Sequence, residues 1–411
     1  MFLLIAWRNI IVNKRRSLIS IFLSAFLTVL LIFFIAWQDG QHEKMIRDSI
    51  EAYTGYVQIQ GLNFQKYPDY EHLVYNLQEV KQKIKHVPGI KHSSERFETF
   101  ALYSAQSDSI GGLLIGIVPS TEQYVSRLKR SVIQGRFLKD TDGADVLVGK
   151  DMAERLKIQI GDKLTFISQA LDYSTAADIL TVKGIFNTAS ALDFNAAFIN
   201  KNYMDSQFLS DNTASAIVIM PVKKQLYKLD NLTAAINKVL DTKKNIAVSW
   251  QTILSSLVQL VNMDSAFGYL SYGILLVVVF FVIMIFSLIN IFQRTKEIGV
   301  LKAIGTKPSQ IFRMIIGESF LLGFISVIIG GIIGLLLIYY FNIHPIEIKV
   351  SKEILDQYKK WGIMDFNFPT LVSYALVLKV CFIVLAMNIV AALYPIYKVN
   401  RFKPIEAINY I

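Results

Sequence analysis

Low charge and scarce cysteine set this 411-residue sequence apart from an ordinary soluble protein. Only 18% of its residues are charged, against roughly 25% in an average soluble domain. A single cysteine, Cys381, excludes an intrachain disulfide framework and any metal site built from several cysteines. Because 53% of the residues are hydrophobic, a large part of the chain must face something other than water.

The missing charge is concentrated in four long stretches. Residues 17–38, 265–293 and 319–346 contain no charged residue, and residues 366–397 contain only Lys379. A bilayer core of about 30 Å takes roughly 20 apolar helical residues, so each stretch is long enough to cross it. We therefore predict four membrane helices. No clear cleavage motif follows the first of them, so we interpret it as a retained membrane helix and not as a signal peptide.

The net charge of +10 lies in three short segments. Residues 1–16 carry +4, residues 294–313 carry +4 and residues 398–411 carry +2, whereas positive and negative charges balance elsewhere. Basic residues beside membrane helices stay in the cytoplasm, so both termini and residues 294–313 are predicted to be cytoplasmic. The surplus is therefore a topology signal, and no nucleic-acid partner is predicted.

These two signals predict an α-helical membrane protein with four transmembrane helices and a large extracytoplasmic α+β domain inserted between helices 1 and 2. The predicted order is a cytoplasmic amphipathic segment at 1–16, membrane helix 1 at 17–38, the periplasmic domain at 39–264, membrane helix 2 at 265–293, a cytoplasmic loop at 294–313, membrane helix 3 at 314–341, a short periplasmic loop at 342–370, membrane helix 4 at 371–397 and a cytoplasmic tail at 398–411. For the first segment an alternative stays open, in which it simply extends the first membrane helix.

The periplasmic segment reads as a folded domain because β-rich runs and polar helical patterns follow one another along it. The predicted strands are Tyr56–Gln60, Phe100–Ala105, Leu113–Val118, Lys163–Ile167, Ile179–Phe186 and Ala214–Met220. The predicted helices are Asn76–His86, Asp151–Lys157 and Asn231–Leu240.

Catalytic and nucleotide-binding motifs are absent from the sequence. It contains no HExxH, no CxxC and no clustered histidines. A phosphate-binding loop reads GxxxxGK[ST], but the spacing from Gly143 to Gly149 is one residue too long and Asp151 replaces the Ser or Thr. Within the membrane stretches the charges are limited to Glu318 and Lys379, each near a boundary or isolated. We therefore predict no active site, no bound cofactor or metal, and an energy source in a partner chain.

The most informative segment is the cytoplasmic run RTKEIGVLKAIG at Arg294–Gly305. Ile298, Leu301 and Ile304 recur at helical spacing and are predicted to form one apolar edge of a short amphipathic helix. Gly305 is a natural helix stop, and Pro308 suits the first turn of the next helix. A glycine inside such a helix costs roughly 1 kcal/mol relative to alanine, so close packing against a partner is expected at Gly299.

At this segment the sequence resembles the FtsX-like permease family of ABC transporters, which includes lipoprotein-releasing and MacB-type efflux permeases. The family pattern is R-x-[KR]-E-I-G-[VI]-L-[KR]-A-I-G, and Arg294–Gly305 fits it. Tyr394-Pro395 and Pro404-Ile405-Glu406-Ala407 also resemble the family's closing motifs. Phrases similar to the lipoprotein-releasing (LolC/LolE-type) branch occur at 55–60, 135–138, 148–150 and 161–164, although Tyr56 stands where that branch commonly has His.

The resemblance implies that the loop couples this chain to an ABC ATPase subunit, which uses ATP and Mg. The implied coupling residues are Arg294, Lys296, Glu297, Ile298, Gly299, Leu301, Lys302, Ala303 and Gly305. It further implies a second permease as homo- or heterodimer partner, lipoprotein or amphiphile cargo, a periplasmic carrier and a place in the bacterial inner membrane. Release of lipoproteins is the expected function. The alternatives are MacB-like efflux of amphiphiles and FtsX-type mechanotransmission that activates a cell-wall hydrolase.

Aromatic residues on the first membrane helix suggest where acyl chains would lie. Phe22, Phe26 and Phe33 are predicted to line an apolar cleft between helices, because acyl chains need only an apolar surface. The alternative is that these rings simply face lipid.

Overall fold

A computed structural model describes residues 2–106, 108–188, 190–224, 226–347, 351 and 367–400. The chain divides into two compact units, a helical one and one built around a large sheet. The helical unit combines the start of the chain with residues from Val261 onwards, and the sheet unit contains Met45–Leu260. The C-terminal tail beyond Asn400, with the predicted Pro404–Ala407 motif, lies outside the described residues, as does most of the predicted loop at 342–370.

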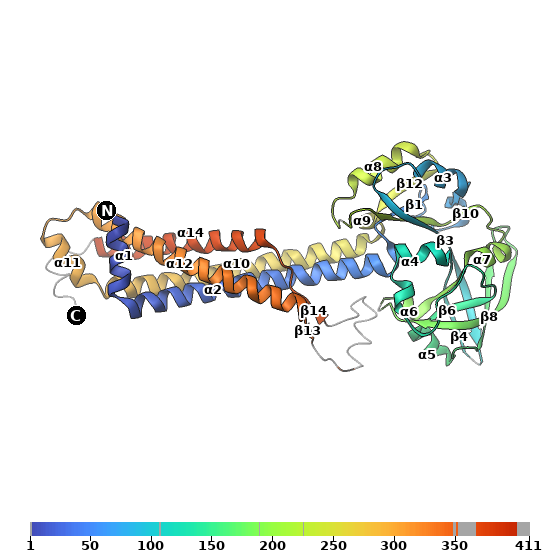
Figure 1. Ribbon diagram of the computed structural model, residues 1–411, viewed down its shortest axis with the longest axis horizontal. Helices are drawn as coiled ribbons and strands as arrows, with labels where there is room; N and C mark the ends of the chain where they lie inside the picture. Colours follow the sequence, from blue (N-terminus) through green and yellow to red (C-terminus); the bar gives the residue numbers. More distant parts are fainter. Residues whose placement is uncertain are drawn as a thin grey trace. The chain divides into compact units, whose positions relative to one another are not determined.

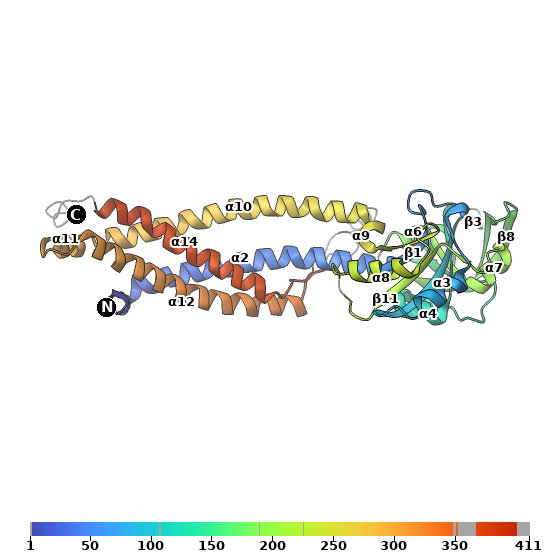
Figure 2. The ribbon, with the colours of Figure 1, turned by 90° about the horizontal axis from the view of Figure 1, so that it is seen from above.

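The helical unit is a bundle in which long helices run side by side (Figures 1 and 2). Its elements are α1 (Phe2–Val12), α2 (Lys14–Ser49), α10 (Ser255–Phe292), α11 (Thr295–Ala303), α12 (Pro308–Ile343), β13 (Ile346–Glu347), β14 (Asn367–Phe368) and α14 (Tyr374–Asn400). Among the described residues, α2, α10, α12 and α14 are long and apolar enough to cross a membrane. They contain the four charge-poor stretches, so the prediction of four apolar helices is confirmed.

The first helix, α1, is separate from α2 and turns away from it at Asn13 (Figure 1). It packs across α12 and not along α2. The hydroxyl of Ser17 donates to the carbonyl of Ile10 at 3.1 Å, which fixes the turn between the two helices. The alternative in which residues 1–16 simply lengthen the first membrane helix therefore does not describe this fold.

Small residues of α12 allow the bundle to pack closely. A Cβ at Gly330 would lie 2.7 Å from the carbonyl oxygen of Ala25 on α2, and one at Gly334 would lie 2.9 Å from Ile32. Glycines permit such approach of membrane helices, where apolar contact alone gives no advantage over lipid. Both glycines lie against α2 of the same chain.

The sheet unit contains one large mixed sheet with strand order β12-β1-β11-β3-β4-β9-β6-β8-β5, and β7 pairs with β3 and β8. Its strands are β1 (Val57–Gly61), β3 (Ile90–Ala105), β4 (Asp108–Ile117), β5 (Val132–Gly135), β6 (Asp145–Gly149), β7 (Lys163–Gln169), β8 (Thr175–Phe186), β9 (Ala196–Asn200), β11 (Ala216–Pro221) and β12 (Asn245–Ser249). A small separate ladder pairs β2 (Val74–Tyr75) with β10 (Thr213–Ala214). All six predicted strands are present.

Short helices and turns connect the strands. They are η1 (Ile50–Thr54), η2 (Tyr70–His72), α3 (Leu77–Ile84), α4 (Pro119–Val125), η3 (Leu128–Ser131), α5 (Lys150–Leu156), α6 (Leu192–Asn195), α7 (Lys201–Phe208), α8 (Asp230–Val239) and α9 (Trp250–Ile253). The three predicted helices correspond to α3, α5 and α8. The main core lies on one side of β3, where Phe97, Tyr103 and Phe166 are fully buried together with Phe208 of α7. The α+β class predicted for this domain is thus confirmed.

Candidate functional site

The short helix α11 follows α10 closely, at one end of the bundle (Figures 1 and 2). It ends at Ala303, and Gly305 adopts a φ of +95°, a left-handed conformation that favours glycine. Pro308 then occupies the first turn of α12, where its missing N–H costs nothing. As predicted from the sequence, Gly305 lies just after the end of α11 and Pro308 begins α12.

One side of α11 faces the bundle and is well packed. Ile298 is 2% exposed and joins Ile291 of α10, Ile311 of α12 and Ile396 of α14 in one apolar cluster. Gly299 is buried beside it, and Leu301 packs partly against the same cluster. Gly299 is thus buried by its own chain, whereas the sequence had predicted close packing against a partner.

The opposite side of α11 is exposed. Lys296, Glu297 and Ala303 are exposed, and Val300 and Ile304 expose 48% and 77% of their surface. The predicted apolar edge of Ile298, Leu301 and Ile304 is therefore wrong in its last member. Each step of three residues turns about 300°, so Ile304 lies about 120° around the helix from Ile298 and points away from the bundle.

Arg294, immediately before α11, points into the bundle and is 9% exposed. Its Nη1 donates to Glu318 Oε2 of α12 at 2.5 Å, and its Nε donates to Glu297 Oε2 at 2.9 Å. Burial lowers the pKa of Arg294, but the carboxylates of Glu318 and Glu297 outweigh burial and leave it raised. The guanidinium therefore stays charged, and the contacts described for it are to Glu318 and Glu297 of the same chain.

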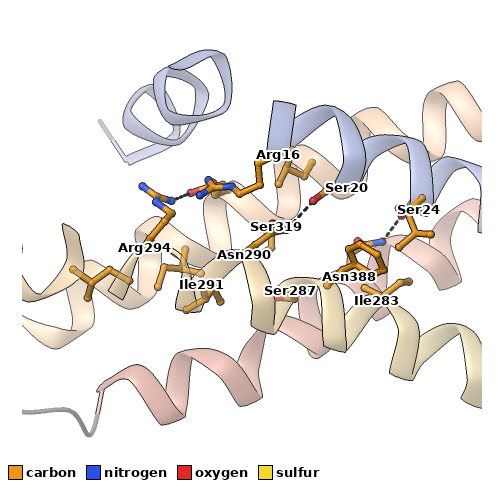
Figure 3. Close-up of a pocket in the computed structure, with 16 residues that line it drawn as sticks. Arg16, Ser20, Ser24, Ile283, Ser287, Asn290, Ile291, Arg294, Ser319 and Asn388 are labelled. Carbon is orange, nitrogen blue, oxygen red and sulfur yellow. Dashed lines mark hydrogen bonds and ion pairs between the residues drawn. The ribbon is translucent and has the colours of Figure 1, made fainter. Parts of the chain in front are cut away.

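Behind Arg294 lies a polar cavity of about 60 Å³ between α2, α10, α12 and α14 (Figure 3). This volume suffices for a few water molecules. Arg16 of α2 donates to Glu318 at 3.0 Å, deeper in the cavity Asn290 donates to Ser20 at 2.7 Å, and Asn388 donates to Ser24 at 3.0 Å.

This arrangement gives Glu318 two partners, whereas the sequence had shown it only as a charge near a membrane boundary. Glu318 lies in a charged cluster with Arg16 and Arg294, next to paired Ser and Asn side chains. Lys379 is elsewhere, exposed on α14, where its charge acts on Asp39 of α2. Sequence reasoning missed Arg16, Asn290 and Asn388. The only available signal was that amides inside membrane helices need partners.

The three phenylalanines predicted to line an acyl cleft lie along one side of α2. Phe22 and Phe26 stack on each other with 6.4 Å between ring centroids and are 72% and 53% exposed. Phe33 is half-buried and contacts Phe341 of α12 edge-on at 5.5 Å. None of the three borders the polar cavity. The pair Phe22–Phe26 therefore offers an outward apolar surface, separate from the charged cluster.

Four membrane-type helices, a large α+β domain and a short helix between two membrane helices define the class of a multi-pass membrane protein with an additional α+β domain. Two family models match this chain: the MacB-like periplasmic core domain at residues 17–238 and the FtsX-like permease C-terminal region at residues 269–404. The chain belongs to the family of FtsX-like permeases with a MacB-like periplasmic core domain, and it is an inner-membrane permease of the ABC-transporter type.

Similar curated proteins carry the name of lipoprotein-releasing system transmembrane protein LolC. The one from Xylella fastidiosa is 23% identical over 319 residues, covering 72% of this chain and 73% of the relative. The one from Neisseria meningitidis is 20% identical over 348 residues, covering 78% and 79%. Among solved structures, the periplasmic region of MacB from Actinobacillus actinomycetemcomitans is 13% identical, with a TM-score of 0.37 over 52% of this chain and 97% of that structure.

Proposed function

We propose that this chain is the permease subunit through which an ATPase in a separate chain drives the release of lipid-anchored proteins from the inner membrane. The name shared by the similar LolC proteins supports this cargo, since each similarity covers more than two thirds of both chains. The charge distribution supports cytoplasmic termini and a cytoplasmic α11, with Met45–Leu260 on the periplasmic side.

The observation that carries the coupling proposal is the exposed face of α11. Val300 and Ile304 expose apolar surface beside the charged Lys296 and Glu297, in a segment between two membrane helices. Exposed apolar groups rimmed by polar residues typically mark a protein interface. The ATPase would therefore contact Lys296, Glu297, Val300, Ala303 and Ile304 directly. The buried members of the motif, Arg294, Ile298 and Gly299, would act by holding the helix in place.

The docking proposal is tested by placing a charge on this face. The double variant Val300→Asp/Ile304→Asp should insert normally, because neither side chain is buried, yet recover about tenfold less ATPase on purification of the membrane complex. Val222→Asp is the matched control, since Val222 is 61% exposed in the sheet unit, and it should leave recovery unchanged. Wild-type recovery with the double variant would rule out this face as the docking site.

The cargo proposal is tested with purified complex in proteoliposomes that hold a triacylated lipoprotein. Each acyl CH₂ taken out of the bilayer costs about 0.8 kcal/mol, so release is expected only with ATP and an acceptor for the acyl chains. The Val300→Asp/Ile304→Asp variant should release none. If lipoprotein stays bound while a small amphiphile is exported or a cell-wall hydrolase is activated, the corresponding alternative function replaces this one.

A further inference from the structure

The carboxylate of Glu318 joins two segments that are far apart in the sequence. Its Oε1 accepts a hydrogen bond from Arg16 Nη2 at 3.0 Å, and its Oε2 accepts one from Arg294 Nη1 at 2.5 Å. Glu318 is 6% exposed, and the two arginine side chains are 16% and 10% exposed. Each carboxylate oxygen therefore holds a different arginine, away from solvent.

The two arginines belong to elements with different tasks. Arg16 lies in the first turn of α2, the helix from which the chain enters the sheet unit. Arg294 precedes α11 and also binds Glu297 in the first turn of that helix at 2.9 Å. A continuous line of ion pairs thus runs from the exposed face of α11 through α12 to the start of α2.

Stability alone does not explain this cluster. A buried ion pair often contributes no more than well-packed apolar residues of similar volume, and two arginines share a single buried carboxylate here. The polar cavity borders all three side chains, so they are not packed on every side. Ion pairs with free space beside them can move together or exchange partners.

We propose that Glu318 is a positioning residue that transmits displacement of α11 to α2. When a partner shifts α11, Arg294 either carries Glu318 and Arg16 with it or separates from Glu318. Separation leaves buried charges without partners, which is costly in a membrane protein, so concerted movement is favoured. This inference rests on the proposed function for the origin of the displacement, but the linkage itself is a property of this chain.

The linkage is measured first on the full chain alone, reconstituted in lipid nanodiscs. In a Cys381→Ser background, spin labels are placed at exposed positions, Ala303 of α11 and Ile19 of α2. Wild type should give one narrow distance distribution. Glu318→Gln and Arg16→Gln should each broaden it, whereas Arg313→Gln, an exposed charge on the same helix as Glu318, should not. An unchanged distribution in both test variants would overturn the linkage, whether or not an ATPase docks.

The second measurement is coupling in the assembled complex. Glu318→Gln and Arg16→Gln should each lower cargo released per ATP hydrolysed by about tenfold while ATPase recovery stays at the wild-type level. The double variant should lose no more than Glu318→Gln alone, because Glu318→Gln already removes the bond to Arg16. Additive losses would refute the proposal. If the wild-type chain recruits no ATPase, the proposed function fails, and the distance measurement still decides the linkage.

Discussion

Single side chains in the sheet unit show that part of the lipoprotein-branch resemblance is structural. In the phrase Gly135-Arg136-Phe137-Leu138, Gly135 has a φ of +74° and Leu138 is 3% exposed. Arg136 donates to both carboxylate oxygens of Asp142, at 2.6 and 3.0 Å. These contacts fold one loop onto the sheet. The phrase therefore reports how the domain is built, and it does not identify cargo.

Arg96 and Glu122 form a fully buried ion pair that fixes β3 to α4. Arg96 donates to the two oxygens of Glu122 at 3.1 and 2.7 Å and to the carbonyl of Tyr53 at 2.6 Å. Both side chains are 0% exposed. Burial lowers the pKa of Arg96, but Glu122, Tyr53 and Glu98 together raise that pKa by more than burial lowers it.

Removing the carboxylate should therefore destabilise the domain. Glu122→Gln leaves the Arg96 charge buried without its counterion, at a cost of about 3–5 kcal/mol. Hydrogen exchange of the β3 amides in the full-length protein should accelerate at least about a hundredfold. Glu79→Gln is the control, because its carboxylate is 60% exposed and pairs with Lys83 on the surface. Equal exchange in both variants would contradict the argument.

At the scale of elements, α12 is the helix that contacts α1, α2 and α14. It contacts α2 through Gly330 and Gly334, α14 through Gly323 and Gly331, and α1 across its surface. A polar pair at its far end, in which the amide of Asn342 donates to the carbonyl of Thr370 at 2.6 Å, fixes the start of the segment that leads into α14. Its small residues therefore serve packing inside one chain.

A large side chain at Gly330 should push α12 away from α2. Gly330→Leu places atoms where Ala25 and Thr28 already lie, and such overpacking commonly costs about 1–3 kcal/mol. The melting temperature of the detergent-purified protein should fall. Gly273→Leu on α10 should leave it unchanged, since a Cβ there meets no atom within 4 Å. A melting temperature unaffected by Gly330→Leu would mean that the two helices are not in contact.

At the scale of the whole molecule, orientation in the membrane depends on charge. The surplus of basic residues lies in segments 1–16, 294–313 and 398–411, whereas basic and acidic residues balance over residues 38–292. The difference predicts that α11 lies in the cytoplasm and the sheet unit in the periplasm. Docking of an ATPase on α11 requires this orientation.

Cysteine labelling tests the orientation directly. In a Cys381→Ser background, single cysteines at Gly143 and Ser351 should react with a membrane-impermeant maleimide in intact spheroplasts. A cysteine at Thr306, between α11 and α12, should react only after lysis. Labelling of Thr306 before lysis would reverse the topology and remove the ATPase from the proposed function.

Local sequence signals were sufficient to predict the membrane helices, the ends of α11 and α12 and several strands of the sheet. Hydropathy located four membrane helices because crossing a bilayer takes a long apolar run. Gly305 and Pro308 marked the end of α11 and the start of α12 because the backbone preferences of these two residue types act locally. Strands with alternating burial such as β7 were visible as well. The strands β6 and β9 escaped notice, because they are short apolar runs with little or no alternation.

Packing alone decided which site residues pair with one another and which are exposed. A sequence pattern cannot show that Arg16 reaches Glu318, because 302 positions separate them and their contact exists only once α2 and α12 lie side by side. The same holds for α11, where the bundle buries Arg294 and Gly299 and leaves Val300 and Ile304 outside. The sequence by itself determined the membrane helices and the family motif, since these follow from composition and local geometry. Which motif residues are exposed and which are buried in the bundle was decided only by tertiary structure, since burial and ion pairing depend on neighbours distant in the chain.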